Sequence, residues 1–504
     1  MRNGWEKIQG AGGYLTVYAA LSLTVLLSLF LALLEGVRIH TFQLEAQLIT
    51  DIAADSVLAE YHRELFEQYG MFWIDTSYGT AEPSVETLKA HMEWYVRQNC
   101  DMEDVFLGDY FYRDLLRMNL DSITILGTAV ASDNGGRFFR EQAVEVVKDE
   151  IGLVFLEQVS QWLKTVEIYG LLESSLEEDK RQADDAIEEL DGQKMQVGDK
   201  WVTIEVENPT VPIEEMKRKG ILNLVMDHPE QVSAKGIDLN QVISHRKHRE
   251  GINQGNWVAE DNESLVERLL WQEYLMKYCG FYGQELEECA LQYQLEYLIV
   301  GKDNDTDNLK GVLHRISAIR EAANALYLYS DKEKSAGVDA VAALLAAAVT
   351  LPELQPVFKT VIMLGWAYTE SLHDVKCLLE GEKIPLLKTE KSWHYDLGFI
   401  LEDMNLDWLL SEDASGENGG EDEWEGEAEV EFALSYADYL RLLLALSPLE
   451  EQTFRMMDIV EMDIRQTPGN TYFRMDGCVD RIMAEVSIKS SYGHAVQISK
   501  SKKY

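Results

Sequence analysis

The sequence predicts a predominantly helical α+β protein, in which one N-terminal transmembrane helix continues into a stalk helix and carries a helical ectodomain with a few short strands. Three observations favour this fold class. A run of 21 residues near the N-terminus is apolar and uncharged, proline is scarce (9 of 504 residues), and long segments carry apolar residues at helical spacing. The apolar content of 46% is enough for a sizeable buried core.

The charge of the chain excludes one class of function. The 88 acidic residues outnumber the 45 basic ones, which leaves a formal net charge of -43. Such a chain repels phosphate backbones, and no basic stripe compensates, so we expect no nucleic-acid partner. The five cysteines contain no C-x-x-C and do not form a disulfide framework, although a single bridge such as Cys279–Cys289 stays open.

Residues 14–34 (YLTVYAALSLTVLLSLFLALL) form the apolar run. As a helix they would extend roughly 31 Å, the thickness of the hydrocarbon core of a bilayer. The alternative is a secretory signal peptide, but the apolar region of such peptides has about 7–15 residues, and no A-x-A-like cleavage site follows Leu34. We therefore predict an uncleaved span with the lipid bilayer as its partner.

A second apolar stretch, residues 338–368, is interrupted by Pro352, Glu353, Pro356 and Lys359. It contains no uninterrupted run of the roughly 18 residues that a membrane span requires. We interpret it as part of two buried helices, residues 338–350 and 357–379, with the prolines at their junction.

The charges that flank the span predict its orientation. Arg2 and Lys7 precede it, and Glu35 follows it directly. The positive-inside rule then places the N-terminus in the cytoplasm and the acidic remainder outside the cell membrane.

The helix is expected to continue beyond the membrane. Residues 35–69 contain no proline and one glycine, Gly36, while Leu44, Leu48 and Ile52 recur at four-residue spacing. Residues 14–69 would then form one rod of 56 residues, roughly 84 Å long. Two separate helices with a break near Gly36 are the alternative, and both remain open.

The remaining elements follow from local patterns. Residues 122–131 predict a strand followed by a turn at 132–136, and residues 201–206 predict another strand. Helical spacing extends over residues 141–190, 436–446 and 452–464, and residues 485–499 alternate around Tyr492-Gly493 like a β-hairpin.

These patterns divide the chain into eight expected segments. They are a cytoplasmic N-terminus (1–13), a transmembrane helix (14–34), a stalk helix (35–70), a first ectodomain unit with a strand and a long helical hairpin (71–207), a loop-rich connection (208–263), a helical block (264–410), an acidic linker (411–431), and C-terminal helices with a hairpin (432–504).

Catalytic motifs fail on inspection. Ser132-Asp133-Asn134 and the S-x-x-K of residues 244–247 match elements of serine β-lactamases, but their order is reversed and K-T-G is missing. G-x-S-x-G, H-E-x-x-H, the Walker A loop and G-x-G-x-x-G are absent from the sequence. We therefore expect no enzymatic activity and no cofactor.

Metal sites are not predicted either. Residues 303–307 (DNDTD) begin like a calcium loop, but Asn308 and His314 occupy the positions that require glycine and glutamate. We predict instead that Asp305 or Thr306 caps a helix. His245 and His248 have three basic neighbours, which favours a surface basic patch over a metal site.

The order of these features resembles a known family. A short N-terminus ending in Gly12-Gly13, one span and a long acidic ectodomain are similar to the TadE/TadG-type pilin-like proteins of Tad (Flp) pilus systems. A more specific resemblance, to an uncharacterised Gram-positive branch of that group, is carried by residues 59–65 (AEYHREL) with Tyr69, 72–79 (FWIDTSYG), 296–302 (EYLIVGK), 366–371 (WAYTES), 435–440 (SYADYL) and 455–461 (RMMDIVE).

The resemblance implies a role in assembling, anchoring or topping a thin surface fibre, without catalysis, and with other pilus or pilin-like subunits as partners through the span and stalk. Pilins cut by prepilin peptidase usually carry glutamate five residues after the processed glycine, whereas Val17 follows Gly12 and Tyr18 follows Gly13 at that distance. This departure favours a membrane-retained accessory subunit.

The candidate processing or assembly positions are Gly12, Gly13 and Glu35. Glu35 would lie at the bilayer edge, where it pairs with a basic residue of a partner or remains an ordinary interfacial charge. The alternative function is a membrane-tethered extracellular sensor or ligand-binding protein with a pocket in residues 264–410, and an ectoenzyme ranks third.

Overall fold

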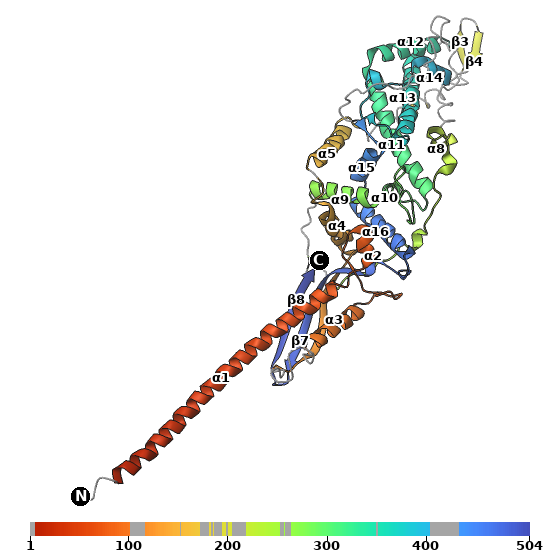
Figure 1. Ribbon diagram of the computed structural model, residues 1–504. Helices are drawn as coiled ribbons and strands as arrows, with labels where there is room; N and C mark the ends of the chain where they lie inside the picture. Colours follow the sequence, from red (N-terminus) through yellow and green to blue (C-terminus); the bar gives the residue numbers. More distant parts are fainter. Residues whose placement is uncertain are drawn as a thin grey trace. The chain divides into compact units, whose positions relative to one another are not determined.

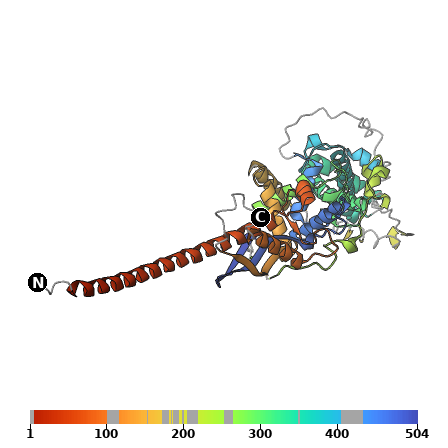
Figure 2. The same ribbon diagram turned by 60° about the horizontal axis from the view of Figure 1, so that its bottom comes forward.

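The computed structural model (Figures 1 and 2) describes residues 6–100, 116–151, 153–171, 181–182, 185, 194–197, 200–203, 218–252, 257, 264–348, 351–403 and 433–504. The chain divides into two units. Unit 1 consists of Met1–Phe139, Lys247–Glu260 and Thr467–Tyr504, and unit 2 of Arg140–Arg246 and Asp261–Gln466. The chain is predominantly helical with a few short strands, which confirms the predicted fold class.

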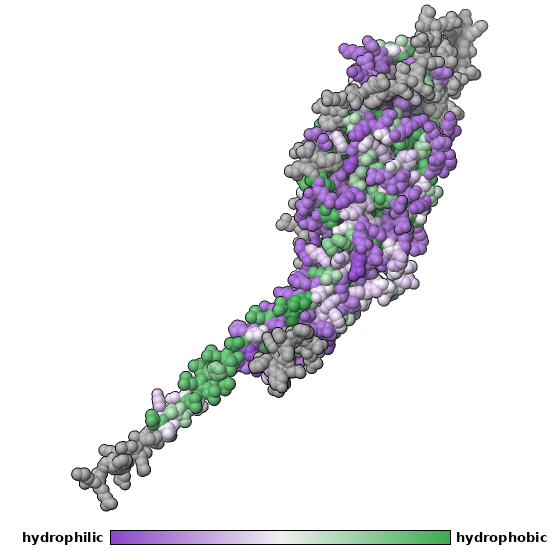
Figure 3. All heavy atoms as spheres, viewed as in Figure 1, coloured by the Kyte–Doolittle hydropathy of each residue, from purple (hydrophilic) through white to green (hydrophobic). Residues whose placement is uncertain are grey.

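Helix α1 (Glu6–Leu58) contains no proline and continues through Gly36 without a break. Nearly all side chains of residues 14–34 are exposed, and Figure 3 shows hydrophobic residues along this part of the helix. Within the described part of the chain, α1 alone is long and apolar enough to cross a membrane, with a mean hydropathy of 2.4 and none of its most apolar window buried. It is thus compatible with a single-pass membrane anchor.

The expected rod does not reach residue 69, because α1 ends at Leu58 and a second helix, α2 (Arg63–Tyr69), begins after a turn. The side chain of Glu60, within that turn, accepts hydrogen bonds from the hydroxyl groups of Tyr78 (2.7 Å) and Tyr95 (2.8 Å). His62 then caps α2 by accepting a hydrogen bond from the backbone N–H of Leu65. These hydrogen bonds stabilise the turn, and they therefore favour the end of α1 over its continuation.

A four-stranded antiparallel sheet forms the centre of unit 1. Strand β7 (Cys478–Ser490) pairs along one edge with β2 (Met118–Val130), and along its other edge first with β1 (Ile74–Asp75) and then with β8 (Ala495–Lys503). Met118 lies opposite Ser490, so the sheet joins distant parts of the sequence. The predicted strand near residues 122–131 and the C-terminal hairpin are confirmed.

The C-terminal half of α1 and helix α3 (Val85–Cys100) pack against this sheet, as Figure 1 shows for α1, β7 and β8. One stripe of α1 is buried there, and the side chains that meet it come from α3, β7 and β8. The buried core includes Phe42, Ile49, Val57, Leu88, Met92, Val486, Ile488 and Ile498. The N-terminal half of α1 is thus exposed, whereas its C-terminal half packs against the sheet of the same chain.

The turn after β2 has the conformation that its sequence suggests. Asn134, Gly135 and Gly136 adopt left-handed backbone conformations, with φ of 52°, 65° and 74°. Helix α4 (Asp133–Val147) continues from this turn and passes from unit 1 into unit 2.

Unit 2 is built mainly from helices. Those in the part of the chain that the structure describes are α5 (Leu153–Ile168), α8 (Ile221–Val225), α9 (Leu265–Tyr278), α10 (Gln294–Val300), α11 (Asp305–Ser330), α12 (Lys332–Ala348), α13 (Gln355–Leu379), α14 (Leu397–Asp403), α15 (Tyr436–Leu446) and α16 (Leu449–Gln466). Short antiparallel strand pairs accompany them, among which the described residues include β3 (Lys194–Val197) with β4 (Lys200–Thr203), and β5 (Ile384–Pro385) with β6 (Ala433–Leu434). The 3-10 helices among the described residues are η1 (Pro229–Gln231), η2 (Leu239–Gln241), η4 (Pro352–Leu354), η5 (Glu390–Ser392) and η7 (Met475–Gly477), the last of which belongs to unit 1.

The second apolar stretch forms parts of two helices with buried faces that meet at the prolines, as predicted, and both helices belong to unit 2. Helices α12 and α13 pack against each other, and Pro352 begins the short 3-10 turn between them. Most of residues 172–190, where the second part of a helical hairpin is expected, and the acidic linker 411–431 lie outside the described residues.

Replacing Leu88 with alanine tests the packing of α3 on the sheet. Leu88 is fully buried, so the cavity left by Leu88→Ala should lower the free energy of unfolding by about 2–5 kcal/mol. Gln98→Ala, at an exposed position of the same helix, should change it by no more than about 0.5 kcal/mol. Urea unfolding of the full chain in detergent micelles measures both, and equal midpoints for the two variants would contradict the packing described.

Candidate functional site

Four of the segments that carry the family resemblance fall in unit 2. Residues 296–302, 366–371, 435–440 and 455–461 contribute to α10, α13, α15 and α16. Helix α10 packs against both α15 and α16, and also against α11. The polar side chains of these segments form buried networks, and an open cavity lies at the C-terminal end of α10.

Glu296 of α10 is fully buried. Its Oε1 atom accepts hydrogen bonds from the backbone N–H of Tyr282 (2.9 Å) and from the hydroxyl group of Tyr436 (2.8 Å). Its Oε2 atom has no hydrogen-bond partner among the described residues. Burial, which disfavours the charged form, raises the pKa of Glu296 to about 7.

Helix α16 contributes further buried carboxylates, among them Asp458 and Glu461. Asp458 accepts hydrogen bonds from the Tyr297 hydroxyl group (2.8 Å) and from the backbone N–H of Ser244 (3.0 Å), and burial raises its pKa. Glu461 binds both terminal nitrogens of Arg246, at 2.8 and 3.1 Å. These contacts fasten the loop around residue 244 onto the helices, which is a structural role.

A separate ionic cluster joins α11 and α13. The Arg320 guanidinium contacts Asp374 at 2.9 Å, and the Lys388 ammonium group lies 2.6 Å from both Glu370 and Asp374. The four side chains are at most 2% exposed, and their two positive and two negative charges balance. Because removing one partner would leave a buried charge uncompensated, this cluster favours the observed packing of α11 against α13.

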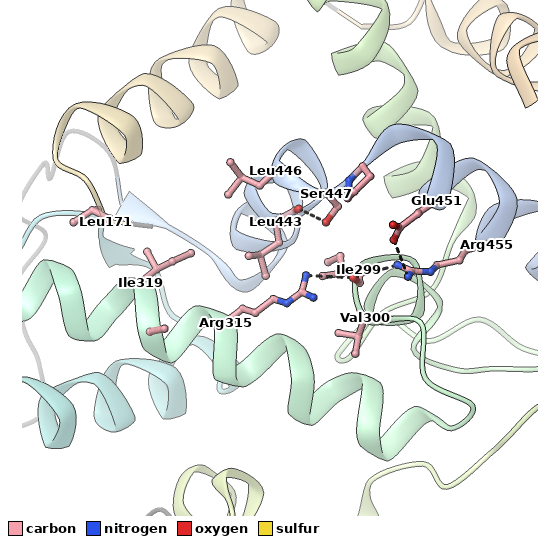
Figure 4. A pocket seen from close by; sticks show the side chains of 12 residues that line it. Leu171, Ile299, Val300, Arg315, Ile319, Leu443, Leu446, Ser447, Glu451 and Arg455 are labelled. Carbon is pink, nitrogen blue, oxygen red and sulfur yellow. Dashed lines mark hydrogen bonds and ion pairs between the residues drawn. The ribbon is translucent and has the colours of Figure 1, made fainter. Parts of the chain in front are cut away.

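A cavity of about 370 Å³ lies beside these networks, between α10, α11, α15 and α16. Aliphatic side chains line much of it, among them Ile319 of α11 and Leu443 and Leu446 of α15 (Figure 4). Helix α10 ends there at Gly301, whose φ of 76° favours glycine. A Cβ atom at this position would lie 2.6 Å from the guanidinium group of Arg455, so glycine also makes room for that side chain.

Two arginines converge at this end of α10. Arg315 of α11 and Arg455 of α16 each donate a hydrogen bond to the carbonyl oxygen of Ile299, at 3.2 and 3.3 Å (Figure 4). Arg455 also binds the carbonyl oxygen of Leu298 (2.8 Å) and the carboxylate of Glu451 (3.0 Å). The arrangement places positive charge beside an apolar wall, a combination suited to binding.

The candidate assembly positions lie elsewhere, in unit 1. Gly12 and Gly13 lie within α1. The Glu35 carboxylate lies 2.8 Å from Nε2 of His494, in the turn of the β7–β8 hairpin, and 3.2 Å from Arg38. The Arg38 guanidinium in turn lies 3.8 Å from the ring centre of Tyr492. The structure therefore brings Glu35 to the hairpin turn of its own chain, and Glu35 is not among the residues that line the cavity.

The predicted cap of α11 is wrong by one position. Asn304 caps the helix by accepting a hydrogen bond from the backbone N–H of Asp307 (2.8 Å). Asp305 is instead buried, and it accepts hydrogen bonds from the Ser233 hydroxyl group (2.6 Å) and the backbone N–H of Tyr293 (3.1 Å). Its carboxylate is thus used to hold two loops together.

In the expected basic patch, His245, Lys247 and Arg249 are exposed, whereas Arg246 pairs with the buried Glu461. Among the described residues, no group of three or more His, Cys, Asp and Glu side chains is arranged to hold a metal ion. All five cysteines are free and buried, so the Cys279–Cys289 bridge is not formed. Asp133 of the Ser-Asp-Asn motif is buried and binds the backbone N–H of Val130.

Sequence reasoning missed Arg315, and it quoted Arg455 without assigning it a role. Arg455 stands within the segment RMMDIVE, which was a usable signal. Arg315 lies in an ordinary helical pattern on α11, and only the tertiary structure shows that it meets Arg455 at the end of α10.

The pKa of Glu296 predicts a pH dependence of stability. The unfolded carboxyl group loses its proton near pH 4.5, whereas the folded one keeps it until about pH 7. Raising the pH through this window should therefore destabilise the protein by on the order of 3 kcal/mol. Glu296→Gln keeps the acceptor oxygen without the charge, so it should lose this part of the pH dependence.

Urea unfolding at pH 5 and pH 8 measures the effect. The variant Glu285→Gln, at an exposed position, should retain the wild-type difference between the two pH values. Parallel pH profiles for Glu296→Gln and the wild type would refute the assignment.

Comparison with known proteins gives one family. No curated protein and no solved structure matches the chain. A family model described as a family of unknown function matches residues 199–490, which is more than half of the sequence and includes α8–α16 and β7. The chain therefore belongs to the family DUF5702.

Proposed function

We propose that the protein is a non-enzymatic, single-pass envelope protein that serves as a pilin-like accessory component of a Tad/Flp-type pilus or secretion apparatus. The observation that carries this proposal is the division of α1. Residues 14–34 expose apolar side chains over the length of a bilayer, whereas the C-terminal half packs on the sheet of unit 1. A helix of this kind anchors at one end and holds its own head at the other.

The exposed face of α1 suggests how the protein associates with partners. It carries a stripe with alternating spacings of four and three residues, which is the seven-residue repeat of helices that pack side by side. The apolar members of the stripe are between 49% and 68% exposed. The stripe consists of Leu23, Leu27, Phe30, Leu34, Val37, Thr41, Leu44 and Leu48.

The stripe continues beyond the apolar run, since Val37, Leu44 and Leu48 follow residue 34. Lipid would not cover these positions if residues 14–34 span the bilayer, and the sheet of unit 1 covers the other side of the helix. Lateral packing against α1 of a neighbouring subunit would remove them from water. The partners in this proposal are therefore the bilayer and other pilin-like subunits.

The proposal includes the location and orientation of the protein. Arg2 and Lys7 before the span favour a cytoplasmic N-terminus, and the large acidic remainder then lies outside the cell membrane. Gly12 and Gly13 would lie on the cytoplasmic side, where a prepilin peptidase would process them if it acts on this chain. The resemblance to TadE/TadG-like proteins supports the same arrangement.

Cysteine cross-linking in native membranes tests the lateral packing. Leu44→Cys places a thiol on the stripe, so oxidation should give a covalent dimer of the full chain. Gln43→Cys is the matched control, because it is exposed at nearly the same depth but points about 100° away around the helix. Equal cross-linking of the two variants, or of neither, would contradict packing through the stripe.

Imaging of cells tests the biological role. Deletion of the gene should remove or shorten surface fibres, and the wild-type gene should restore them. A Leu44→Glu, Leu48→Glu double variant should not, because it places charges in the proposed helix contact. Fibres unchanged by the deletion would instead favour the second candidate below.

The cavity of unit 2 favours that second candidate, a membrane-tethered extracellular sensor or ligand-binding protein. Its support is the convergence of Arg315 and Arg455 beside an apolar wall. This function does not require association through the stripe.

A further inference from the structure

The cavity between α10, α11, α15 and α16 has two chemically different walls. Ile319, Leu443 and Leu446 give one wall a continuous aliphatic surface. Figure 4 shows Arg315 and Arg455 reaching from α11 and α16 toward the same point at the end of α10. A ligand that fills the cavity would therefore touch hydrocarbon on one side and guanidinium groups on the other.

The positive charge at this point is incompletely compensated. Glu451 is the carboxylate among the lining residues, and its side chain is 57% exposed where it pairs with Arg455. Two guanidinium groups and one carboxylate leave a net charge of +1 in a protein whose total is -43. This local excess of positive charge favours an anion.

Arg315 has N–H donors that make no hydrogen bond within the described part of the chain. A guanidinium group carries five N–H donors, and within the described part of the chain Arg315 uses its Nη1 atom for one hydrogen bond, to Ile299. Burial, and then the neighbouring charge of Arg455, lower the pKa of Arg315. An anion between the two arginines would occupy the remaining donors and relieve the repulsion.

We propose that this cavity binds a small aliphatic carboxylate, with its head group on Arg315 and Arg455 and its hydrocarbon chain against Ile319, Leu443 and Leu446. A carboxylate matches the planar, paired donors of guanidinium, and one negative charge matches the net charge of the site. The volume of about 370 Å³ lies near the lower end of the range for ligand cavities, which favours a small molecule. This inference is independent of the proposed role in a pilus.

Hexanoate is a suitable probe, because it has the charge and a short aliphatic chain. Equilibrium dialysis of radiolabelled hexanoate against the full chain in lipid nanodiscs, with empty nanodiscs as the blank, should show saturable binding to one site. Acetate, which lacks the chain, and hexan-1-ol, which lacks the charge, should each compete at least about tenfold more weakly. Hexanol that competes as well as hexanoate, or hexanoate binding no greater than that of empty nanodiscs, would overturn the proposal.

Two variants locate the site. Arg315→Gln removes a charged donor from an exposed helix position and should weaken hexanoate binding about tenfold or more. Ala318→Trp fills the cavity from the exposed face of α11 and should abolish binding. Arg97→Gln makes the same charge change on α3, where the side chain is 64% exposed, and should bind hexanoate like the wild type.

These variants are chosen so that a loss of binding is not explained by unfolding. Circular dichroism of each variant checks that the helices are intact, and both substituted positions are at the surface of α11. Wild-type affinity in both Arg315→Gln and Ala318→Trp would exclude this cavity as the binding site, even if hexanoate binds elsewhere on the chain.

Discussion

The structure of unit 1 depends on one helix that meets two different environments. Residues 14–34 of α1 make no protein core, and the face of α1 that includes Phe42 and Ile49 is buried against the sheet. The hydrophobic effect acts on both halves, but only the second half is satisfied by this chain alone. The first half is compatible with a single-pass membrane anchor, so one continuous helix combines a candidate membrane span with a segment that packs on the sheet.

In unit 2, buried carboxylates stabilise irregular segments through hydrogen bonds, whereas in unit 1 strand pairing in the sheet joins distant segments. Asp458, Glu461 and Asp305 hold irregular loops by accepting their backbone or side-chain donors. Glu296 does the same for the loop at Tyr282. Several segments that carry the family resemblance therefore place acidic residues on the buried faces of their helices.

Much of the fold could be predicted because its signals are local. The apolar run of residues 14–34, the strand before Asn134-Gly135-Gly136 and the hairpin around Tyr492-Gly493 are each visible in a short window. The end of α1 at Leu58 was missed, because it depends on Glu60 meeting Tyr78 and Tyr95. The cavity was missed for the same reason: Arg315 and Arg455 are 140 positions apart in the sequence, and no local pattern brings them together.

The central place of β7 has a consequence for how this family can be handled in isolation. The matched region, residues 199–490, contains β7 but neither β2 nor β8, and it leaves out β1 as well. A protein cut to those limits would carry a 13-residue strand with both edges bare and its buried face stripped of α1 and α3. Unpaired strand edges of this length pair with strands from other molecules, so we expect such a fragment to aggregate. Experiments on the region expressed alone would thus measure its aggregation and say little about the native protein.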